Sequence, residues 1–423
     1  MRILKLSAQS GVGSAFVCAL GLAALAPAAA AASPGDGGHA PPPRTILVAG
    51  GFLARVRQRG DAAVLREVRI EADKAMKQSP LSVMDKHATP PSGDKHDYMS
   101  LAPYFWPNPA TANHLPYVRR DGQHNPQASS IEDHANLFRM EDAVHALALG
   151  YFFTGDVVYA KRASLLLHVW FLDPATRMNP GLKYAQAVLG VNEGRGTGIL
   201  DARGLADVVD ALALLAGSGS WTATDDAAMH TWFDAYFNWL TTSSNGRNEA
   251  AAKNNHGSWY DEQAEAIALY LGKTQFAREL AETAKTKRIA LQIQADGQQP
   301  LEEVRTKSFG YCVFNLQALM RLASMAQTVG VDMWSYRAED GASIRLALDY
   351  LLPFADKQEK WSHEDIEGMS PDSLQAPLLM AALHYRDAAY EAAAIKMKGK
   401  DDAKILLLER EFAESQATAA NTR

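Results

Sequence analysis

Two short polar segments of the chain contain side chains that can move protons or stabilise negative charge. The first, residues 253–262, reads KNNHGSWYDE and contains Asn254, Asn255 and His256. The two amides are neutral hydrogen-bond donors, and the imidazole is a titratable base. The segment precedes an expected helix start, where the helix N-terminus adds partial positive charge. We therefore interpret it as part of a site, with Trp259 as an adjacent aromatic face. A histidine that merely caps a helix or packs in the core is the alternative.

The second segment, residues 302–311, reads EEVRTKSFGY. Arg305 and Lys307 are suited to hold anionic groups, and both could lower the pKa of Tyr311 by favouring its phenolate. A free tyrosine titrates near about 10, and each unit of depression requires about 1.4 kcal/mol. Taken alone the segment is weak, because a tyrosine at a helix start is commonly just packed.

Two further segments are rich in aromatic residues or glycine. Residues 98–108 read YMSLAPYFWPN, and Tyr104 and Trp106 there could stack on sugar rings, or the segment could be a buried strap across helix ends. Residues 184–199 read YAQAVLGVNEGRGTGI. This run lacks the Lys-Ser/Thr and the preceding strand of a phosphate loop. Its glycines could bring the backbone close to a ligand.

The glycine-rich segment also supplies polar groups, namely Gln186, Asn192 and Arg195. We interpret these as uncharged and cationic donors to a substrate. A structural turn with Arg195 in a salt bridge is an equal alternative.

The elements that must position these segments follow a helical pattern, with apolar residues at helical spacing between short Gly, Asp or Ser stops. The expected helices cover residues 137–151, 157–172, 202–216, 225–240, 259–271, 276–294, 312–329, 342–354, 373–394 and 404–415. There is no βαβ alternation, so the pattern predicts an all-α fold of antiparallel helix hairpins. Either an incomplete α/α toroid or a superhelical array fits. Long non-helical segments at 98–125, 178–201, 243–258 and 295–311 favour the toroid.

The N-terminus has the layout of a secretory signal. Residues 1–32 combine Arg2 and Lys5 with an apolar stretch and an Ala-rich end, and the stretch is shorter than the ~20 residues of a membrane span. We expect a cleaved signal, a flexible leader over residues 33–43, and a single domain over 44–423. The protein would then be periplasmic or secreted, without a membrane span.

Charge and cysteine content exclude several classes of protein. Loss of the signal takes the formal charge from −6 to −8, and no basic run suggests nucleic acid as a ligand. Cys18 lies in the signal and Cys312 stands alone, so a disulfide scaffold or Cys-rich metal module is not expected. We interpret Cys312 as a small packed residue. No second histidine follows His256 at helical spacing, so we expect neither metal nor cofactor.

Taken together, these segments resemble the alginate-lyase-like superfamily of polysaccharide lyases, which have an incomplete α/α toroid fold. The resemblance spans roughly residues 98–319. It is carried by SLAPYFWP at 100–107, YAQ at 184–186, GRG at 194–196, NNH at 254–256, and Glu303, Arg305 and Thr306 followed by Tyr311.

The resemblance implies that Asn255, His256, Arg305 and Tyr311 form the catalytic set. The six-residue step from Arg305 to Tyr311 looks one residue shorter than in the best-known alginate lyases. It is more similar to a branch that acts on glucuronan-like or mannuronate-containing chains. The implied partner is an anionic polysaccharide, and we expect a monomer.

β-Elimination would give these residue types their roles. The C5 proton of a uronic acid can be removed only if its carboxylate is neutralised, work suited to Asn255 and Arg305. Tyr311 or His256 would take the proton, and Tyr311 could protonate the departing oxygen. Positioned acid–base groups typically contribute ~10²–10⁴-fold each.

A polyanionic substrate also demands positive charge inside the cleft of an acidic protein. We expect Lys253, Arg195, Arg305 and Lys307 to be concentrated there.

Two other classes of function fit parts of the sequence. An α/α-barrel glycoside hydrolase needs two carboxylates across the scissile bond, for which Asp201, Asp261, Glu302 and Glu303 are available. A non-catalytic periplasmic glycan-binding protein would need the aromatic strap alone. The site residues favour the lyase, because a helical-hairpin fold is common to all three.

Overall fold

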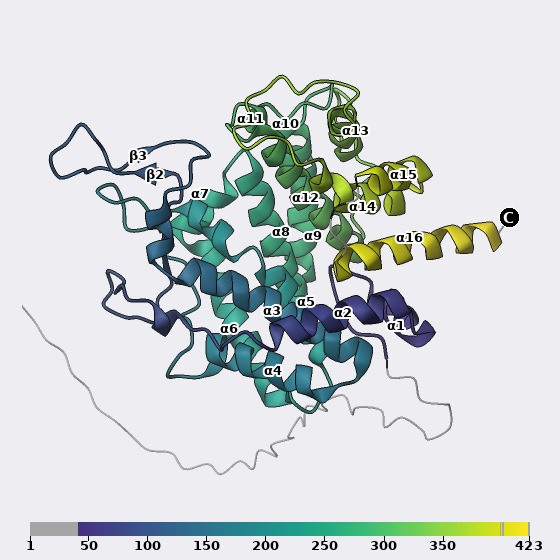
Figure 1. The fold of residues 1–423 in the computed structure, drawn as a ribbon, viewed down its shortest axis with the longest axis horizontal. Helices are drawn as coiled ribbons and strands as arrows, with labels where there is room; N and C mark the ends of the chain where they lie inside the picture. Colours follow the sequence, from purple (N-terminus) through teal and green to yellow (C-terminus); the bar gives the residue numbers. More distant parts are fainter. Residues whose placement is uncertain (1–40, 398, 400–401, 422–423) are drawn as a thin grey trace, which may run out of the picture. The chain divides into compact units, whose positions relative to one another are not determined.

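Helical hairpins make up most of the structure, which is a computed structural model that describes residues 41–397, 399 and 402–421 (Figure 1). The expected signal at 1–32 and the leader up to residue 40 lie outside the described residues. The described residues from 42 onwards belong to one unit of mutual contacts. The prediction of an all-α fold is confirmed.

The longer elements are α1 (Gly50–Arg59), α2 (Ala62–Ala75), α3 (Asp133–Thr154), α4 (Val157–Leu167), α5 (Leu205–Leu215), α6 (Ala223–Thr242), α7 (Ser244–Ala250), α8 (Asn255–Tyr270), α9 (Thr274–Ala284), α12 (Ser308–Ala326), α13 (Ile344–Ala355), α14 (Gln375–Tyr385), α15 (Ala388–Lys396) and α16 (Ala403–Asn421). Short helices are α10 (Ala290–Gln292) and α11 (Pro300–Glu303), and π-helical turns cover η3 (His168–Leu172) and η5 (Lys285–Ile289). The 3₁₀ turns are η1 (Val83–Asp85), η2 (Pro126–Ser130), η4 (Gly196–Ala202), η6 (Gln327–Val329) and η7 (Pro371–Leu374).

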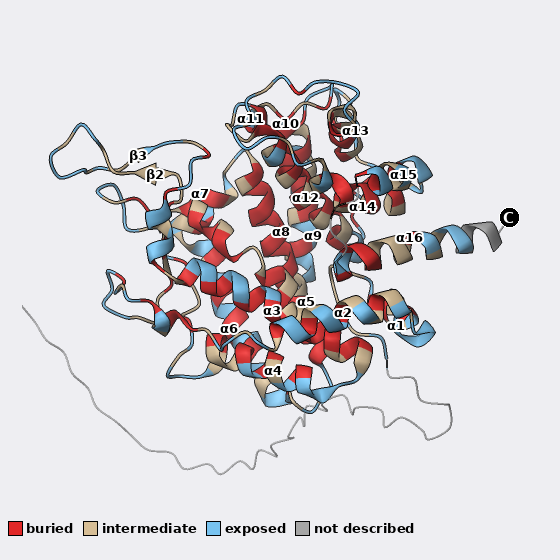
Figure 2. Ribbon diagram, in the orientation of Figure 1, coloured by how far each residue is buried: buried red, intermediate tan, exposed pale blue. Residues whose placement is uncertain are grey.

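A row of buried helices forms the interior. Helix α3 packs on α5, α5 on α8, and α8 on α12, and α8 and α12 run side by side (Figure 1). Figure 2 shows α8 buried along almost its whole length, polar residues included. A helix buried on all sides needs internal partners for its polar groups, and α8 therefore carries many of the buried ion pairs and hydrogen bonds described below.

Helix ends follow the sequence closely where capping residues occur. Thr222 and Asp225 form a reciprocal capping box at the start of α6, and Asp61 and Asp156 accept backbone N–H groups at the starts of α2 and α4. Gly155 ends α3 in the left-handed conformation. These local signals explain why the helix order could be predicted from sequence.

Several predicted boundaries were wrong. Helix α8 begins at Asn255 and α12 at Ser308, so Asn255, His256 and Tyr311 lie in first helical turns. The segment 243–258, expected to be non-helical, contains α7. The helix expected over 373–394 is divided at Arg386, which adopts a left-handed conformation. Helices α1 and α2 were not predicted.

Two small sheets hold the non-helical segments in place. Strand β1 (Met99–Leu101) pairs in parallel with β4 (Tyr184–Ala187), and β2 (Phe105–Trp106) pairs antiparallel with β3 (Val118–Arg119). The first sheet joins the aromatic segment to the glycine-rich segment, which are about 80 residues apart in sequence. Both segments therefore reach the same end of α8 and α12 as a connected unit.

The glycines of the glycine-rich segment, residues 184–199, allow the chain to pack closely against itself. A Cβ on Gly198 would lie 2.5 Å from the Cβ of Ala185, closer than real contacts allow. The backbone here approaches strand β4, which corrects our interpretation that the glycines make room for a ligand.

A buried arginine fixes the connection between α7 and α8. Arg288, in η5, donates to both carboxylate oxygens of Asp261 at 2.7 and 3.0 Å. It also donates to the carbonyls of Ala252 and Ala250 at 2.6 and 2.8 Å. Only glycine fits at Gly257, since a Cβ there would lie 2.3 Å from Arg288 Nη1. Arg288 thus holds the turn that presents the first residues of α8.

We predict that Arg288→Met lowers the free energy of unfolding by about 3–5 kcal/mol, because it leaves Asp261 as a buried carboxylate without its partner. Arg66→Met, which removes an exposed arginine of α2, should change it by no more than about 0.5 kcal/mol. Urea unfolding followed by circular dichroism measures both. Equal, small effects would show that the Arg288 pair does not stabilise the fold.

Candidate active site

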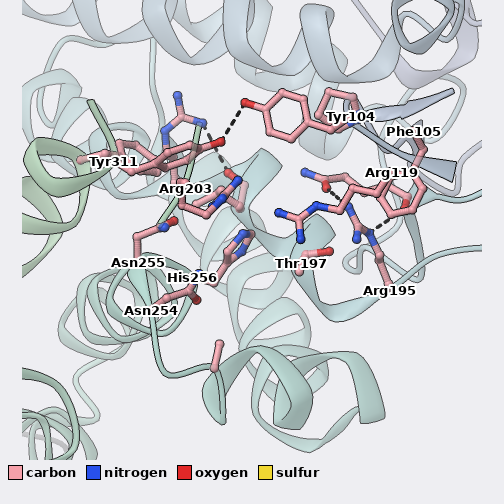
Figure 3. A pocket seen from close by; sticks show the side chains of 16 residues that line it. Tyr104, Phe105, Arg119, Arg195, Thr197, Arg203, Asn254, Asn255, His256 and Tyr311 are labelled. Carbon is pink, nitrogen blue, oxygen red and sulfur yellow. Dashed lines mark hydrogen bonds between the residues drawn. The ribbon is translucent and has the colours of Figure 1, made fainter. Parts of the chain in front are cut away.

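A cavity of about 510 Å³ lies where α8 and α12 begin (Figure 3). Its walls come from the β1–β3 segment, the glycine-rich segment, η4, the α7–α8 turn and the start of α12. The lining residues are Pro103, Tyr104, Phe105, Arg119, Gln186, Arg195, Thr197, Leu200, Arg203, Ala252, Asn254, Asn255, His256, Arg305, Tyr311 and Phe314. All four residues of the predicted catalytic set are among them.

Tyr311 is held between a second tyrosine and an arginine. Its hydroxyl donates to the hydroxyl of Tyr104 at 2.9 Å, and the Cζ of Arg305 lies 3.9 Å from the centre of its ring. Tyr104 belongs to the turn between β1 and β2, so the aromatic segment reaches directly into the site. Tyr104 lines the cavity, and its contact with substrate stays a prediction.

Burial raises the pKa of the Tyr311 phenol well above its usual range, and the hydrogen bond to Tyr104 adds to this. The Arg305 charge opposes the shift without cancelling it. Our expectation that Arg305 and Lys307 would lower the pKa below that of a free tyrosine was therefore wrong. The physical reason is desolvation, which penalises the phenolate more than one nearby cation stabilises it.

Arg305 is fixed by Asp121, which lies 184 residues earlier in the chain. Its Nε and Nη2 donate to the two carboxylate oxygens at 2.9 and 2.8 Å, and Arg119 donates to the same carboxylate at 2.6 Å. These cations and the N–H of Thr306 hold the pKa of Asp121 well below its usual range, against the effect of burial. The Nε and Nη2 atoms of Arg305 are thus occupied by Asp121. Its Nη1 atom and its positive charge remain available to interact with other groups in the cavity.

Asn255 is clamped by a buried glutamate from α11. Its backbone N–H and its side-chain Nδ2 donate to the two carboxylate oxygens of Glu302, both at 2.6 Å. Burial raises the pKa of Glu302, and Asn255 opposes this by donating both hydrogen bonds. Asn255 Oδ1 is buried without a hydrogen-bond partner among the described residues. The orientation of this amide is therefore set by the protein before any ligand binds.

His256 is oriented in the same way. Its Nδ1 lies 2.6 Å from Oε1 of Glu249, a residue of α7 that is only 2% exposed. The carboxylate favours the tautomer with the proton on Nδ1, which leaves Nε2 as a free acceptor. Figure 3 shows the imidazole pointing into the cavity together with Asn255 and Tyr311.

The glycine-rich segment contributes a linked pair of donors. Gln186 donates from Nε2 to Asp201 at 2.8 Å and accepts from Arg195 Nη2 at 2.9 Å. Arg195 also donates to the backbone oxygen of Gln186 and lies over the Phe105 ring at 5.0 Å. Gln186 and Arg195 line the cavity as expected. Arg195 is bound to a neutral amide, so the salt-bridge alternative does not hold among the described residues.

Four of the residues proposed to bind substrate do not line the cavity. Trp259 is buried against Phe314, and Lys307 forms an ion pair with Glu367. The Trp106 indole donates to the Gln123 carbonyl at 3.0 Å, and the Asn192 side chain accepts from the Val188 N–H at 3.1 Å. Asn254, in contrast, lies on the cavity wall. Packing accounts for Trp259, an ion pair for Lys307, and local hydrogen bonds for Trp106 and Asn192.

The cavity is lined by positive charge, as expected, but not by all of the residues that we expected to supply it. Arg195 and Arg305 line it, but Lys253 and Lys307 do not. Arg119 and Arg203 take their place, and the lining contains no Asp or Glu. Sequence reasoning missed these two arginines. Arg203 follows the glycine-rich segment closely, and this spacing was the only available signal.

The carboxylates that a glycoside hydrolase would need are engaged elsewhere. Asp201 accepts from Tyr98, Ser100 and Gln186, and Asp261 binds Arg288. Glu302 clamps Asn255, and Glu303 accepts from the backbone N–H of Gln299. None of the four lines the cavity, so the geometry disfavours the hydrolase.

The described residues contain neither a metal-binding cluster nor a helix that could cross a membrane. No group of three or more His, Cys, Asp or Glu is arranged there to hold a metal ion. None of the described helices combines the length and apolar character that a bilayer span requires. Cys312 is a free, fully buried thiol, in agreement with a packing role.

The cavity combines four arginines with a tyrosine and a histidine, groups suited to bind an anion and to transfer protons, and comparisons with known proteins identify the class of protein. The profile of the alginate lyase family matches residues 82–361. An alginate lyase from Bacteroides ovatus is 38% identical, with a TM-score of 0.83, over 87% of this chain and 99% of the other. No curated protein matches significantly.

Alginate lyase A1-III from Sphingomonas species A1 shares the fold at 16% identity and a TM-score of 0.53, over 82% of this chain and 93% of that one. The fold is therefore the predicted α/α toroid, and the protein is a polysaccharide lyase. The chain belongs to the alginate lyase family.

The Asp121 clamp makes a prediction about pH. Because its native pKa is depressed, Asp121 stabilises the fold above the unfolded-state value near about 3.9, and this contribution is lost as the pH falls through and below that value. Asp121→Asn should therefore lower the melting temperature at about pH 7, and its difference from wild type should shrink towards about pH 3. Glu359→Gln, which removes an exposed carboxylate, is the control. A pH-independent difference would contradict the assignment.

Proposed function

We propose that this lyase cleaves a uronic-acid polymer, either alginate of the polymannuronate type or glucuronan, by β-elimination that leaves unsaturated uronate ends. The observation that carries the proposal is the cavity itself, which presents four arginines, Tyr311 and His256 and no lining carboxylate. The 38% identity to an alginate lyase supports a polyuronate substrate. Mannuronate and glucuronate differ only at C2, so the reacting C4 and C5 centres are the same.

The elimination has two proton transfers and one charge to stabilise. A base removes the C5 proton, the resulting charge spreads onto the neighbouring carboxylate, and an acid protonates the leaving oxygen on C4. In both sugars these events occur on one face of the ring. An acid and a base that project into one cavity from neighbouring helices are suited to this syn geometry.

Tyr311 acts as the acid in this proposal. Its raised pKa keeps the phenol protonated at neutral pH, so it is ready to donate a proton and poorly suited to accept one. After donation, the phenolate lies beneath the Arg305 guanidinium, 3.9 Å from the ring centre. Arg305 therefore assists mainly by stabilising the phenolate, because Asp121 already occupies its bidentate face.

His256 acts as the base. Glu249 holds Nδ1, so Nε2 is the acceptor that faces the substrate, and the carboxylate stabilises the imidazolium that forms. Asn255, locked in place by Glu302, presents its amide to the substrate carboxylate without having to reorganise.

Binding of the sugar rings falls to Tyr104, Gln186, Arg195 and Asn254, which line the cavity. Four residues outside the cavity lining act through the residues they support, namely Trp106, Asn192, Trp259 and Lys307. We also propose that residues 1–32 direct export to the periplasm or medium, and that the enzyme works as a monomer without a cofactor.

Tyr311→Phe should abolish unsaturated product, with a loss of at least about 10²-fold in kcat, because the variant has no proton to donate. Its melting temperature should change little, since one hydrogen bond contributes about 1 kcal/mol. Absorbance in the near ultraviolet over a panel of polyuronates measures the product. Tyr151→Phe, a partly buried tyrosine of α3, is the matched control. Normal turnover by Tyr311→Phe would refute the acid assignment.

His256→Ala should be comparably inactive, and Glu249→Gln should fall between it and wild type, because the amide keeps the hydrogen bond but loses the charge that stabilises the imidazolium. The same assay measures both, alongside thermal unfolding. An unchanged rate combined with a lower melting temperature would instead favour a histidine that only caps α8.

A further inference from the structure

Arg203 is the cavity arginine with the fewest partners. It lies between η4 and α5, and its guanidinium sits between two aromatic rings, with Cζ 5.8 Å from the centre of Phe138 and 5.7 Å from that of Phe314. Among the described residues it makes one hydrogen bond, which is long, 3.4 Å from Nη1 to the carbonyl of Leu200. A guanidinium has five N–H donors, so most of its capacity is unused.

The other cavity arginines are engaged. Arg119 and Arg305 share the carboxylate of Asp121, and Arg195 donates twice to Gln186. Among the described residues no carboxylate lies within ion-pair distance of Arg203. An unpaired cation inside a cavity without acidic lining is a site for an anion.

Glu141, a buried acid beside the turn that precedes α5, forms no ion pair with Arg203. A Cβ on Gly204 would lie 2.2 Å from Oε2 of Glu141, which places that carboxyl directly beside this turn. Burial raises the pKa of Glu141 well above its usual range, although Arg203 opposes the shift. The Oε1 atom of Glu141 has no hydrogen-bond partner among the described residues, so Glu141 does not occupy the donors of Arg203, and these stay available to a ligand.

The position of Arg203 indicates which ligand group it meets. Phe314, which it contacts, lies three residues after Tyr311 on α12, and Phe314 packs on Trp259, three residues after His256 on α8. Residues three apart share a helix face, so Arg203 lies about one turn beyond both proton carriers. A sugar whose C4 oxygen and C5 proton lie between Tyr311 and His256 would direct the carboxylate on its C5 towards the Arg203 guanidinium.

We propose that Arg203, steadied between Phe138 and Phe314, binds the carboxylate of the sugar whose C5 proton is removed. This deepens the proposed function and rests on it. Together with the Asn255 amide, Arg203 supplies the neutralisation that lets the C5 proton leave, a role that we first expected of Arg305. Both rings lie within cation–π distance of the planar guanidinium and so stabilise its charge and its position.

The test compares Arg203→Met with Arg203→Lys. Arg203→Met should lower kcat by about 10²–10³-fold, the usual effect of removing one donor to a developing charge, and Arg203→Lys should recover at least about 10-fold by restoring the charge. Arg139→Met, which removes an exposed arginine beside Phe138, is the matched control and should behave as wild type. Equal losses in Arg203→Met and Arg203→Lys, or no loss in either, would overturn the proposal.

A binding measurement separates a ligand role from a structural one. By calorimetry in the inactive Tyr311→Phe background, the protein should bind a uronate oligosaccharide at least about 10-fold more tightly than its carboxyl-reduced counterpart, and adding Arg203→Met should remove most of this preference. If both oligosaccharides weaken equally in Arg203→Met, Arg203 only supports the cavity wall. If wild type forms no unsaturated product from any polyuronate, the proposed function fails; if Arg203→Met forms it normally, only this inference fails.

Discussion

Positive charge gathered where the inner helices begin is the constraint on which the rest of the structure depends. The first turns of α8 and α12 line the cavity, Arg203 precedes α5 there, and helix N-termini carry partial positive charge. Arginines brought together in a partly dry place repel one another, so each needs a counter-charge, a neutral acceptor or an aromatic face. Asp121, Gln186, and the ring pair of Phe138 and Phe314 provide one of each.

The same arrangement explains why buried acids surround the site without entering it. Glu302 clamps Asn255 and Glu249 clamps His256, so each carboxylate orients a neutral side chain and keeps its own charge off the cavity wall. Burial raises the pKa of Tyr311, which keeps its proton in place, and Arg305 over the ring stabilises the phenolate left after donation. Acid, base and charge stabiliser are thus assigned by environment more than by residue type.

The sequence predicted the parts of this arrangement that are local. Asn255 and His256 are adjacent, Arg305 and Tyr311 are six residues apart, and helix stops such as Gly155 mark the hairpins. Long-range contacts could not be predicted. Asp121 meets Arg305 across 184 residues, and nothing near Arg203 in sequence reveals that it lies between Phe138 and Phe314. We predicted Trp259 and Lys307 as substrate contacts because the sequence alone does not reveal that Trp259 packs on Phe314 or that Lys307 pairs with Glu367.

In the proposed function, the arginine-lined cavity neutralises a uronate carboxylate so that the polysaccharide is cut by elimination. Mass spectrometry of the products from polymannuronate and glucuronan tests it most directly, because elimination leaves a C4–C5 double bond and hydrolysis adds a water molecule. We expect oligosaccharides with unsaturated uronate at the new non-reducing end, each lighter by one water than the hydrolysis product. Oligosaccharides with saturated ends would contradict it.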